Sequence, residues 1–169
     1  MKIRLLTIIN LLAWTVIHSQ SNIANMPKSD KSIEPFLIEV INSDYSRAHS
    51  ISLVLTNKSL KIIFRGGLEG EKDSILLTKN ILPSDTLKKI SEINLDDLKA
   101  YYSNDCIQDG SQITIKFHKS GKMKTIHLSN YYQTDIGEII YLVNALVPTK
   151  YKIWYDKERL LSEQEKCQH

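Results

Sequence analysis

The stretch "TIKFHKSGKMKTIHL", residues 114–128, alternates apolar and polar side chains on both sides of a Ser-Gly pair at 120–121. This alternation around a two-residue turn is typical of an antiparallel β-hairpin. The predicted register pairs Lys119 with Lys122. Because successive side chains of a strand point to opposite faces, one face is apolar and the other is polar. The apolar face comprises Ile113, Ile115, Phe117, Ile126 and Leu128, and the polar face comprises Thr114, Lys116, His118, Met123, Thr125 and His127.

A second hairpin is indicated by "HSISLVLTNKSLKIIFRG", residues 49–66. A two-residue turn at 57–58 pairs Leu55 with Leu60 and brings the alternating apolar residues of both strands onto one face. A correct register requires this agreement, because a slip by one residue would turn every apolar side chain to the other face. Two further stretches predict strands, at 34–41 and 74–82.

Helical signals lie between and after these hairpins. Pro83 and a capping Ser84 predict a short helix over 85–92, and "LDDLKAYY" (95–102) indicates a further helical turn.

The clearest helical pattern is "DIGEIIYLVNALVP", residues 135–148. Asp135, with a glutamate three positions later, resembles a capping box, and the apolar residues that follow have helical spacing. "YKIWY" (151–155) predicts a short strand, and Asp156 caps a last helix that extends through Cys167. The elements together predict an α+β domain: an antiparallel sheet of about five to six strands built from hairpins, with two to three helices mainly on one face.

The start of the chain is typical of a secretory signal peptide over residues 1–19. Lys2 and Arg4 precede an apolar run, which is shorter than the ~20 residues that span a bilayer. We expect cleavage near Ser19 or Gln20 and export to the periplasm or the medium, with no membrane span in the mature protein. The polar residues 20–32 then form a flexible leader, and residues 33–169 form a single globular domain.

Cleavage changes the charge of the protein. The whole chain has 22 Lys and Arg against 19 Asp and Glu, and loss of Lys2 and Arg4 leaves 20 against 19. A mature charge of about +1 gives no support to nucleic-acid binding, which needs a concentrated basic face.

The two cysteines, Cys106 and Cys167, both lie in the mature part. An even number of cysteines in an exported chain favours a disulfide. The bridge would close a loop of about sixty residues and stabilise the fold by roughly 4 kcal/mol.

Candidates for catalysis are few. His118, His127 and Asp109 are the candidates for a hydrolase of envelope polymers, chosen by residue type alone. The two histidines share a face of the hairpin but lie ~13 Å apart at 3.4 Å per residue, too far for one metal ion. "RGGLEGEKD" (65–73) lacks the G-K-[ST] ending of a phosphate loop. The sequence therefore predicts no metal and no cofactor, and it favours a protein that is not an enzyme.

Candidates for binding are clearer. Lys116, His118, Lys122 and His127 of the 114–128 hairpin could bind an anion, and Tyr131 and Tyr132 could contribute to a recognition surface. For the tyrosines the alternative is packing, with one ring of each doublet in the core.

Three stretches resemble small exported bacterial proteins of the Bacteroidetes type, whose function is unknown: "LPSDTLKKISEINLDDLKAYYSNDCIQDG", "GKMKTIHL" and "HLSNYYQTDIGEIIYLVNALVPTKYKIWYDKERLLSEQEKC". The resemblance covers about residues 49–167 and implies an exported envelope protein, but no activity.

The leading hypothesis is thus an exported, non-catalytic binding or accessory domain with a protein partner in the envelope or outside the cell, its oligomeric state open. Two alternatives are an anion-binding module for acidic polysaccharide or lipid, using the 114–128 hairpin, and the small hydrolase.

Overall fold

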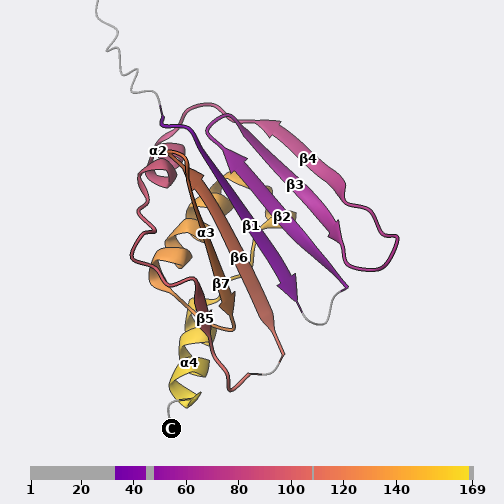
Figure 1. Ribbon diagram of the computed structural model, residues 1–169, viewed down its shortest axis with the longest axis vertical. Helices are drawn as coiled ribbons and strands as arrows, with labels where there is room; N and C mark the ends of the chain where they lie inside the picture. The colour runs from indigo at the N-terminus through magenta and orange to yellow at the C-terminus, as the bar shows by residue number, and fades with distance from the viewer. Residues whose placement is uncertain (1–32, 45–47, 108, 168–169) are drawn as a thin grey trace, which may run out of the picture. The chain divides into compact units, whose positions relative to one another are not determined.

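The computed structural model describes residues 33–44, 48–107 and 109–167 (Figure 1). The predicted signal peptide (1–19) and leader (20–32) lie outside the described residues. The strands are β1 (Phe36–Asp44), β2 (His49–Thr56), β3 (Ser59–Gly66), β4 (Ser74–Asn80), β5 (Tyr101–Ser103), β6 (Ser111–Lys119) and β7 (Lys122–Ser129). They form one seven-stranded sheet in the order β4-β3-β2-β1-β6-β7-β5 (Figure 1).

Both predicted hairpins are confirmed with their registers. In β2 and β3, Leu55 lies opposite Leu60, and in β6 and β7, Lys119 lies opposite Lys122. The second turn has positive φ at both central residues, 50° at Ser120 and 76° at Gly121, as the twist of a two-residue hairpin requires. β1 lies between the hairpins and pairs antiparallel with β2 and β6.

The prediction of five to six antiparallel strands was too low, because the sheet has a seventh strand. β5 pairs parallel with β7, so the sheet is mixed, though mostly antiparallel. The further helical turn predicted for 95–102 is confirmed only at its start, where Leu98 N donates to Leu95 O (3.2 Å), because Tyr101 and Tyr102 belong to β5. The backbone of Ala100 instead accepts a hydrogen bond from His127 N (2.9 Å), and Asn104 N donates to Ser129 O (3.0 Å). A strand of three residues is too short to show a period of two, so only its pairing partner defines it.

Three α-helices follow the predicted order: α2 (Asp85–Glu92), α3 (Thr134–Leu146) and α4 (Lys157–Cys167). Ser84 caps α2 as predicted, since its side chain accepts from Leu87 N. The cap of α3 is Gln133, whose side chain accepts from Ile136 N (2.8 Å), so the capping box predicted at Asp135 was wrong. Glutamine has a longer side chain than the usual capping residues Ser, Thr, Asp and Asn. The sequence pattern therefore indicated Asp135, two positions after the actual cap.

The segment between α3 and α4 is not the strand predicted for 151–155. A 3₁₀ turn, η1 (Thr149–Tyr151), is followed by extended backbone whose hydrogen bonds go to side chains. Ile153 donates to Asn144 Oδ1 and accepts from Asn144 Nδ2, both at 2.9 Å. Asp156 caps α4 as predicted, because its Oδ1 accepts from Arg159 N at 3.0 Å.

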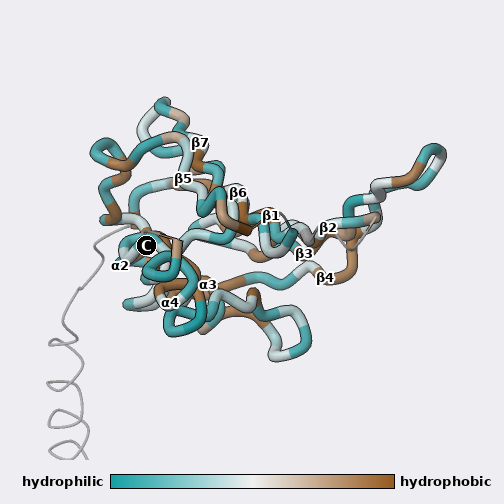
Figure 2. The backbone as a smooth tube through the Cα atoms, turned by 90° about the horizontal axis from the view of Figure 1, so that it is seen from below, coloured by the Kyte–Doolittle hydropathy of each residue, from teal (hydrophilic) through white to brown (hydrophobic). Residues whose placement is uncertain are grey.

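The helices all lie against the same face of the sheet (Figure 2). This covered face is apolar: Ile38, Leu53, Ile62 and Ile115 each have 0% exposure. Its residues form one cluster with apolar residues of α2 and α3, namely Leu87, Ile90, Ile136, Ile139, Ile140, Leu142 and Val143. Burial of this cluster is the main stabilising contribution. We call the other side of the sheet the open face.

Helix α4 has a weaker attachment than α3. Leu160, at 2% exposure, is its one buried residue, whereas α3 buries five. Cys106 and Cys167 lie at disulfide distance, with Cα atoms 5.7 Å apart, as the prediction of a bridge requires. The pair connects the end of α4 to the loop between β5 and β6.

Within the described residues, none of the helices has the length and the apolar character that a membrane crossing requires.

Candidate functional site

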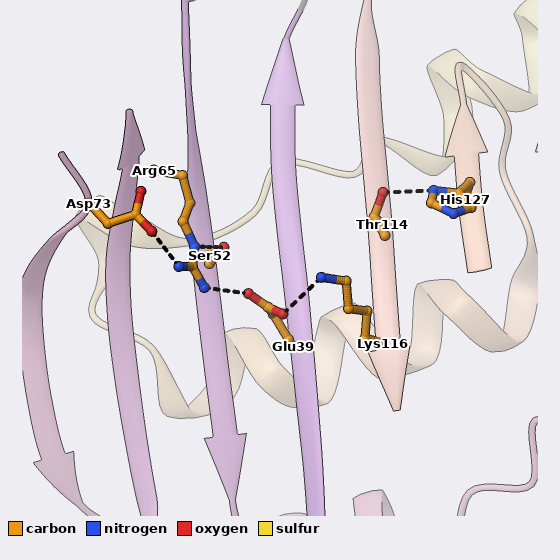
Figure 3. Close-up of polar contacts among 7 residues, drawn as sticks. All are labelled: Glu39, Ser52, Arg65, Asp73, Thr114, Lys116 and His127. Atoms are coloured by element: carbon orange, nitrogen blue, oxygen red, sulfur yellow. Dashed lines mark hydrogen bonds and ion pairs between the residues drawn. The ribbon is translucent and has the colours of Figure 1, made fainter. Parts of the chain in front are cut away.

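The centre of the open face carries a chain of ion pairs across four segments (Figure 3). Arg65 of β3 contacts Asp73 at 2.6 Å and Glu39 of β1 at 2.8 Å. Glu39 also contacts Lys116 of β6 at 3.4 Å. Ser52, fully buried under this chain, accepts a hydrogen bond from Arg65 Nε at 3.1 Å. The predicted binding residue Lys116 therefore has an internal acidic partner.

The carboxyl group of Glu39 is largely covered, with 13% of its side chain exposed. Burial opposes its ionisation, but the hydrogen bond from Arg65 and the charge of Lys116 outweigh this, and the pKa of Glu39 lies below its usual value. The ionised form is thus favoured by folding. The contribution to stability is complete above the pKa of the unfolded chain and is lost as the pH falls through the lower pKa of the folded state.

We therefore expect Glu39→Gln to lower the free energy of unfolding by about 2 kcal/mol near neutral pH, the range found for hydrogen bonds to charged groups. The difference from the parent chain should disappear in acid, where Glu39 is protonated. Urea denaturation at neutral and acidic pH measures both quantities. Glu138→Gln, which removes an exposed acid of α3, is the control and should have little effect. A deficit that persists unchanged in acid would contradict the ionic role.

The two histidines of the hairpin also lie on the open face. His118 is opposite Met123, four positions from His127, which is opposite Thr114. His127 Nδ1 shares a hydrogen bond of 3.0 Å with Thr114 Oγ1 (Figure 3). Both histidines are exposed. Among the described residues no cluster of three or more His, Cys, Asp or Glu side chains could hold a metal ion.

The hydrolase candidates do not assemble into a reactive group. His127 has a hydroxyl neighbour, but its hydrogen-bond partners among the described residues include no acid that would orient the ring. Asp109 lies beyond the other end of β6, and its backbone carbonyl accepts from Asn130 Nδ2 at 3.3 Å. The cysteines are paired. The described residues thus contain no arrangement of a nucleophile, a base and an acid that orients the base.

Lys122 does not join the other three basic candidates. Because it pairs with Lys119, its side chain has the parity of Phe117 and points to the covered side of the sheet. The sequence grouped Lys122 with Lys116, His118 and His127 by residue type, although the predicted register already separated them. Counting alternate positions from the turn would have shown that Lys122 points to the covered face and that the other three residues point to the open face.

On the covered side, Lys122 lies at a cavity of about 620 Å³, which we call the tip cavity. It lies between the turn of the β6–β7 hairpin and the chain that follows α2, which meet in Figure 1. Its lining residues are Glu92, Ile93, Asn94, Leu95, Asp96, Phe117, Lys119, Ser120, Lys122, Met123 and Lys124.

The lysines of the tip cavity differ in their contacts. Lys119 Nζ donates to Ser91 O at the end of α2 and contacts Glu34 at 3.4 Å, and Lys124 Nζ donates to Asp96 O at 3.2 Å. Lys122 is exposed and has no hydrogen-bond or ion-pair partner among the described residues. Phe117 and Leu95, with 6% and 3% exposure, form an apolar floor. The cavity thus combines ordered ammonium groups, one free ammonium group and buried apolar surface.

The two predicted binding tyrosines are engaged in internal packing. Tyr131 contacts the ring of Tyr102 with centroids 5.4 Å apart, and Tyr132 stacks on Tyr155 at 5.1 Å. The Tyr155 hydroxyl donates to Tyr131 O at 2.9 Å, and burial raises its pKa. A methyl group at Gly137 would lie 2.4 Å from the Tyr132 oxygen, so this position of α3 needs glycine. The contacts of Tyr155 join the segment before α4 to the segment before α3.

No model of a known protein family, no curated protein and no solved structure matches the chain. The resemblance to small exported bacterial proteins stays a prediction from the sequence, and the function has to be argued from the geometry.

Proposed function

We propose that this chain is an exported, non-catalytic binding domain, and that its ligand is an anionic amphiphile held in the tip cavity. The observation that carries the proposal is the convergence of Lys119, Lys122 and Lys124 on a cavity with an apolar floor. Export is supported by the predicted signal peptide and is compatible with the cysteine pair.

The two parts of the cavity suit the two parts of such a ligand. An acyl chain would lie against Ile93, which lines the cavity and is partly exposed, above the buried side chains of Phe117 and Leu95. A carboxylate or phosphate would lie among the ammonium groups. The hydrogen bonds of Lys119 and Lys124 to backbone carbonyls hold these side chains in place before binding, which lowers the entropy that binding has to overcome. Glu92 at the end of α2 and Asp96 after it also line the cavity, and Glu34 pairs with Lys119. These acids favour a ligand with a single negative charge over a polyanion.

The open face is a weaker site for an anion. Its best-placed cation, Lys116, is shared with Glu39, and the next, Arg65, is held by two carboxylates. An anion there would have to displace Glu39, which is ionised and largely buried. We therefore propose that an anion binds at the turn of the 114–128 hairpin and not on its polar face.

Calorimetric titration of the full chain with dodecanoate tests the proposal. Lys122→Gln should weaken binding about 5-fold, the equivalent of ~1 kcal/mol for one exposed charge, and added salt should weaken it further. Lys61→Gln, which removes an exposed lysine of β3 on the open face, is the matched control and should leave binding unchanged. Acetate, which has the charge without the chain, should bind at least 10-fold more weakly. Equal binding of acetate and dodecanoate, or no binding of either, would refute the proposal.

A further inference from the structure

A second cavity, of about 360 Å³, lies at the opposite end of β1 and β6 from the tip cavity. We call it the basal cavity. One wall is formed by the ends of strands, with Asn42, His49 and Ser50, and the other by the segment before α4 and its first turn, with Lys152, Trp154 and Arg159. Its volume lies in the range of small-molecule sites.

The second wall is held rigidly. The backbone of Ile153, whose side chain is 5% exposed, makes two hydrogen bonds to the Asn144 side chain at 2.9 Å. Tyr155 is fixed on the other side by its hydroxyl, which accepts from Gln133 N at 2.9 Å. Between these two fixed residues, Trp154 has 59% of its surface exposed. An exposed indole on a rigid backbone offers a large flat contact surface at little cost in conformational entropy.

Basic groups surround this indole. The Arg159 guanidinium lies over the Trp154 ring at 4.5 Å from its centroid and contacts Glu163 at 3.5 Å. Its Nε is buried and has no hydrogen-bond partner among the described residues, which is unusual for a buried donor. Lys152 has no ion-pair partner among them either. His49, Lys152 and Arg159 are the ionisable lining residues that the structure describes.

We propose that the basal cavity binds an acidic sugar, a ring with one carboxylate and several hydroxyl groups. The flat indole of Trp154 would stack against the ring, as aromatic side chains do against extended apolar surface. Lys152, which has no ion-pair partner among the described residues, would pair with the carboxylate, and Asn42 and Ser50 offer an amide and a hydroxyl to the sugar hydroxyls. The cavity shares no lining residue with the tip cavity, so the inference does not depend on the proposed function.

Tryptophan fluorescence reports on this cavity directly. The sequence has 2 tryptophans, and Trp14→Phe in the full chain leaves Trp154 as the single one. We expect glucuronate to change the emission saturably at millimolar concentration, and glucose, which lacks the carboxylate, to bind at least 10-fold more weakly. Lys152→Gln should weaken glucuronate binding about 5-fold. Lys150→Gln is the matched control two residues away, and its ammonium group lies over Tyr151 instead (4.6 Å).

Several outcomes would overturn the inference. These are no saturable change with glucuronate, glucose bound as tightly as glucuronate, and equal effects of Lys152→Gln and Lys150→Gln. Asn42→Ala provides a second test that does not change the charge of the cavity. It should weaken the binding of glucuronate but not the binding of benzoate, a planar carboxylate without hydroxyl groups. Benzoate binding more tightly than glucuronate would also reject a sugar as the ligand. Circular dichroism of each variant confirms that the fold is retained.

Discussion

Replacing Cys106 and Cys167 together by serine should lower the free energy of unfolding by roughly 4 kcal/mol. The two residues are separated by 61 positions, so the bridge restricts a long loop of the unfolded chain. In the folded state it holds α4, which buries only Leu160 in the core. Exchanging both cysteines at once avoids leaving a free thiol that could form bridges between molecules.

Urea denaturation of the oxidised chain and of the double variant measures the loss. A reducing agent should destabilise the parent chain by a similar amount and should not affect the variant, which is the internal control. Hydrogen exchange should show that α4 is affected first, because its other attachments are few. Equal midpoints for the parent chain and the variant would contradict a structural role of the bridge.

The bridge also has a consequence for the basal cavity. Arg159, which lies over Trp154, belongs to α4, so the cavity depends on the helix that the bridge holds. Reduction should therefore change the emission of Trp154 before the sheet unfolds. In the oxidising surroundings that the proposed export implies, the bridge and the cavity would be maintained together.

The hairpins could be predicted because their information is local. The Ser-Gly turn at 120–121 and the alternation on either side of it determine the register without help from the rest of the chain. The place of β1 between β2 and β6 could not be predicted in this way. β2 follows β1 directly in the chain, but its other partner, β6, is far away in sequence, and nothing in the residues of β1 selects it. β5 was missed for the same reason, since only its contact with β7 makes it a strand.

The candidate sites show a similar limit. Lys122 and its neighbours could have been assigned to the tip by counting parity, because the hairpin is a local element. The carbonyls that accept from these lysines come from the end of α2 and the loop after it, which have no sequence signal linking them to the turn. Of the two cavities, the basal cavity has the weaker sequence signal. Its residues come from four separate segments, at 42–43, 49–51, 110–111 and 152–159.

One face of the sheet is buried under the helices and the other is partly exposed, so substitutions on the two faces should change the stability by different amounts. Ile38→Ala should lower the free energy of unfolding by about 3–4 kcal/mol, since it removes buried methyl groups and leaves a cavity. Ile38 has 0% exposure and lies between Leu55 and Phe117 in the central strand, under the helices. Ile41→Ala, three residues along β1, makes the same chemical change on the open face, between Ser52 and Thr114.

Because Ile41 is only partly buried, its replacement by alanine should lower the free energy of unfolding by about 1 kcal/mol. Chemical denaturation of both variants measures the two losses in the free energy of unfolding. The slope of this free energy against denaturant concentration should be the same as in the parent chain. Equal losses would mean that the open face is packed as tightly as the covered one, which would contradict a sheet with helices on one side. A small loss at Ile41 would indicate that the open face is accessible in the folded chain, in agreement with its partly exposed ion pairs. The two anion sites that we propose would then lie at the ends of the sheet and not on this face.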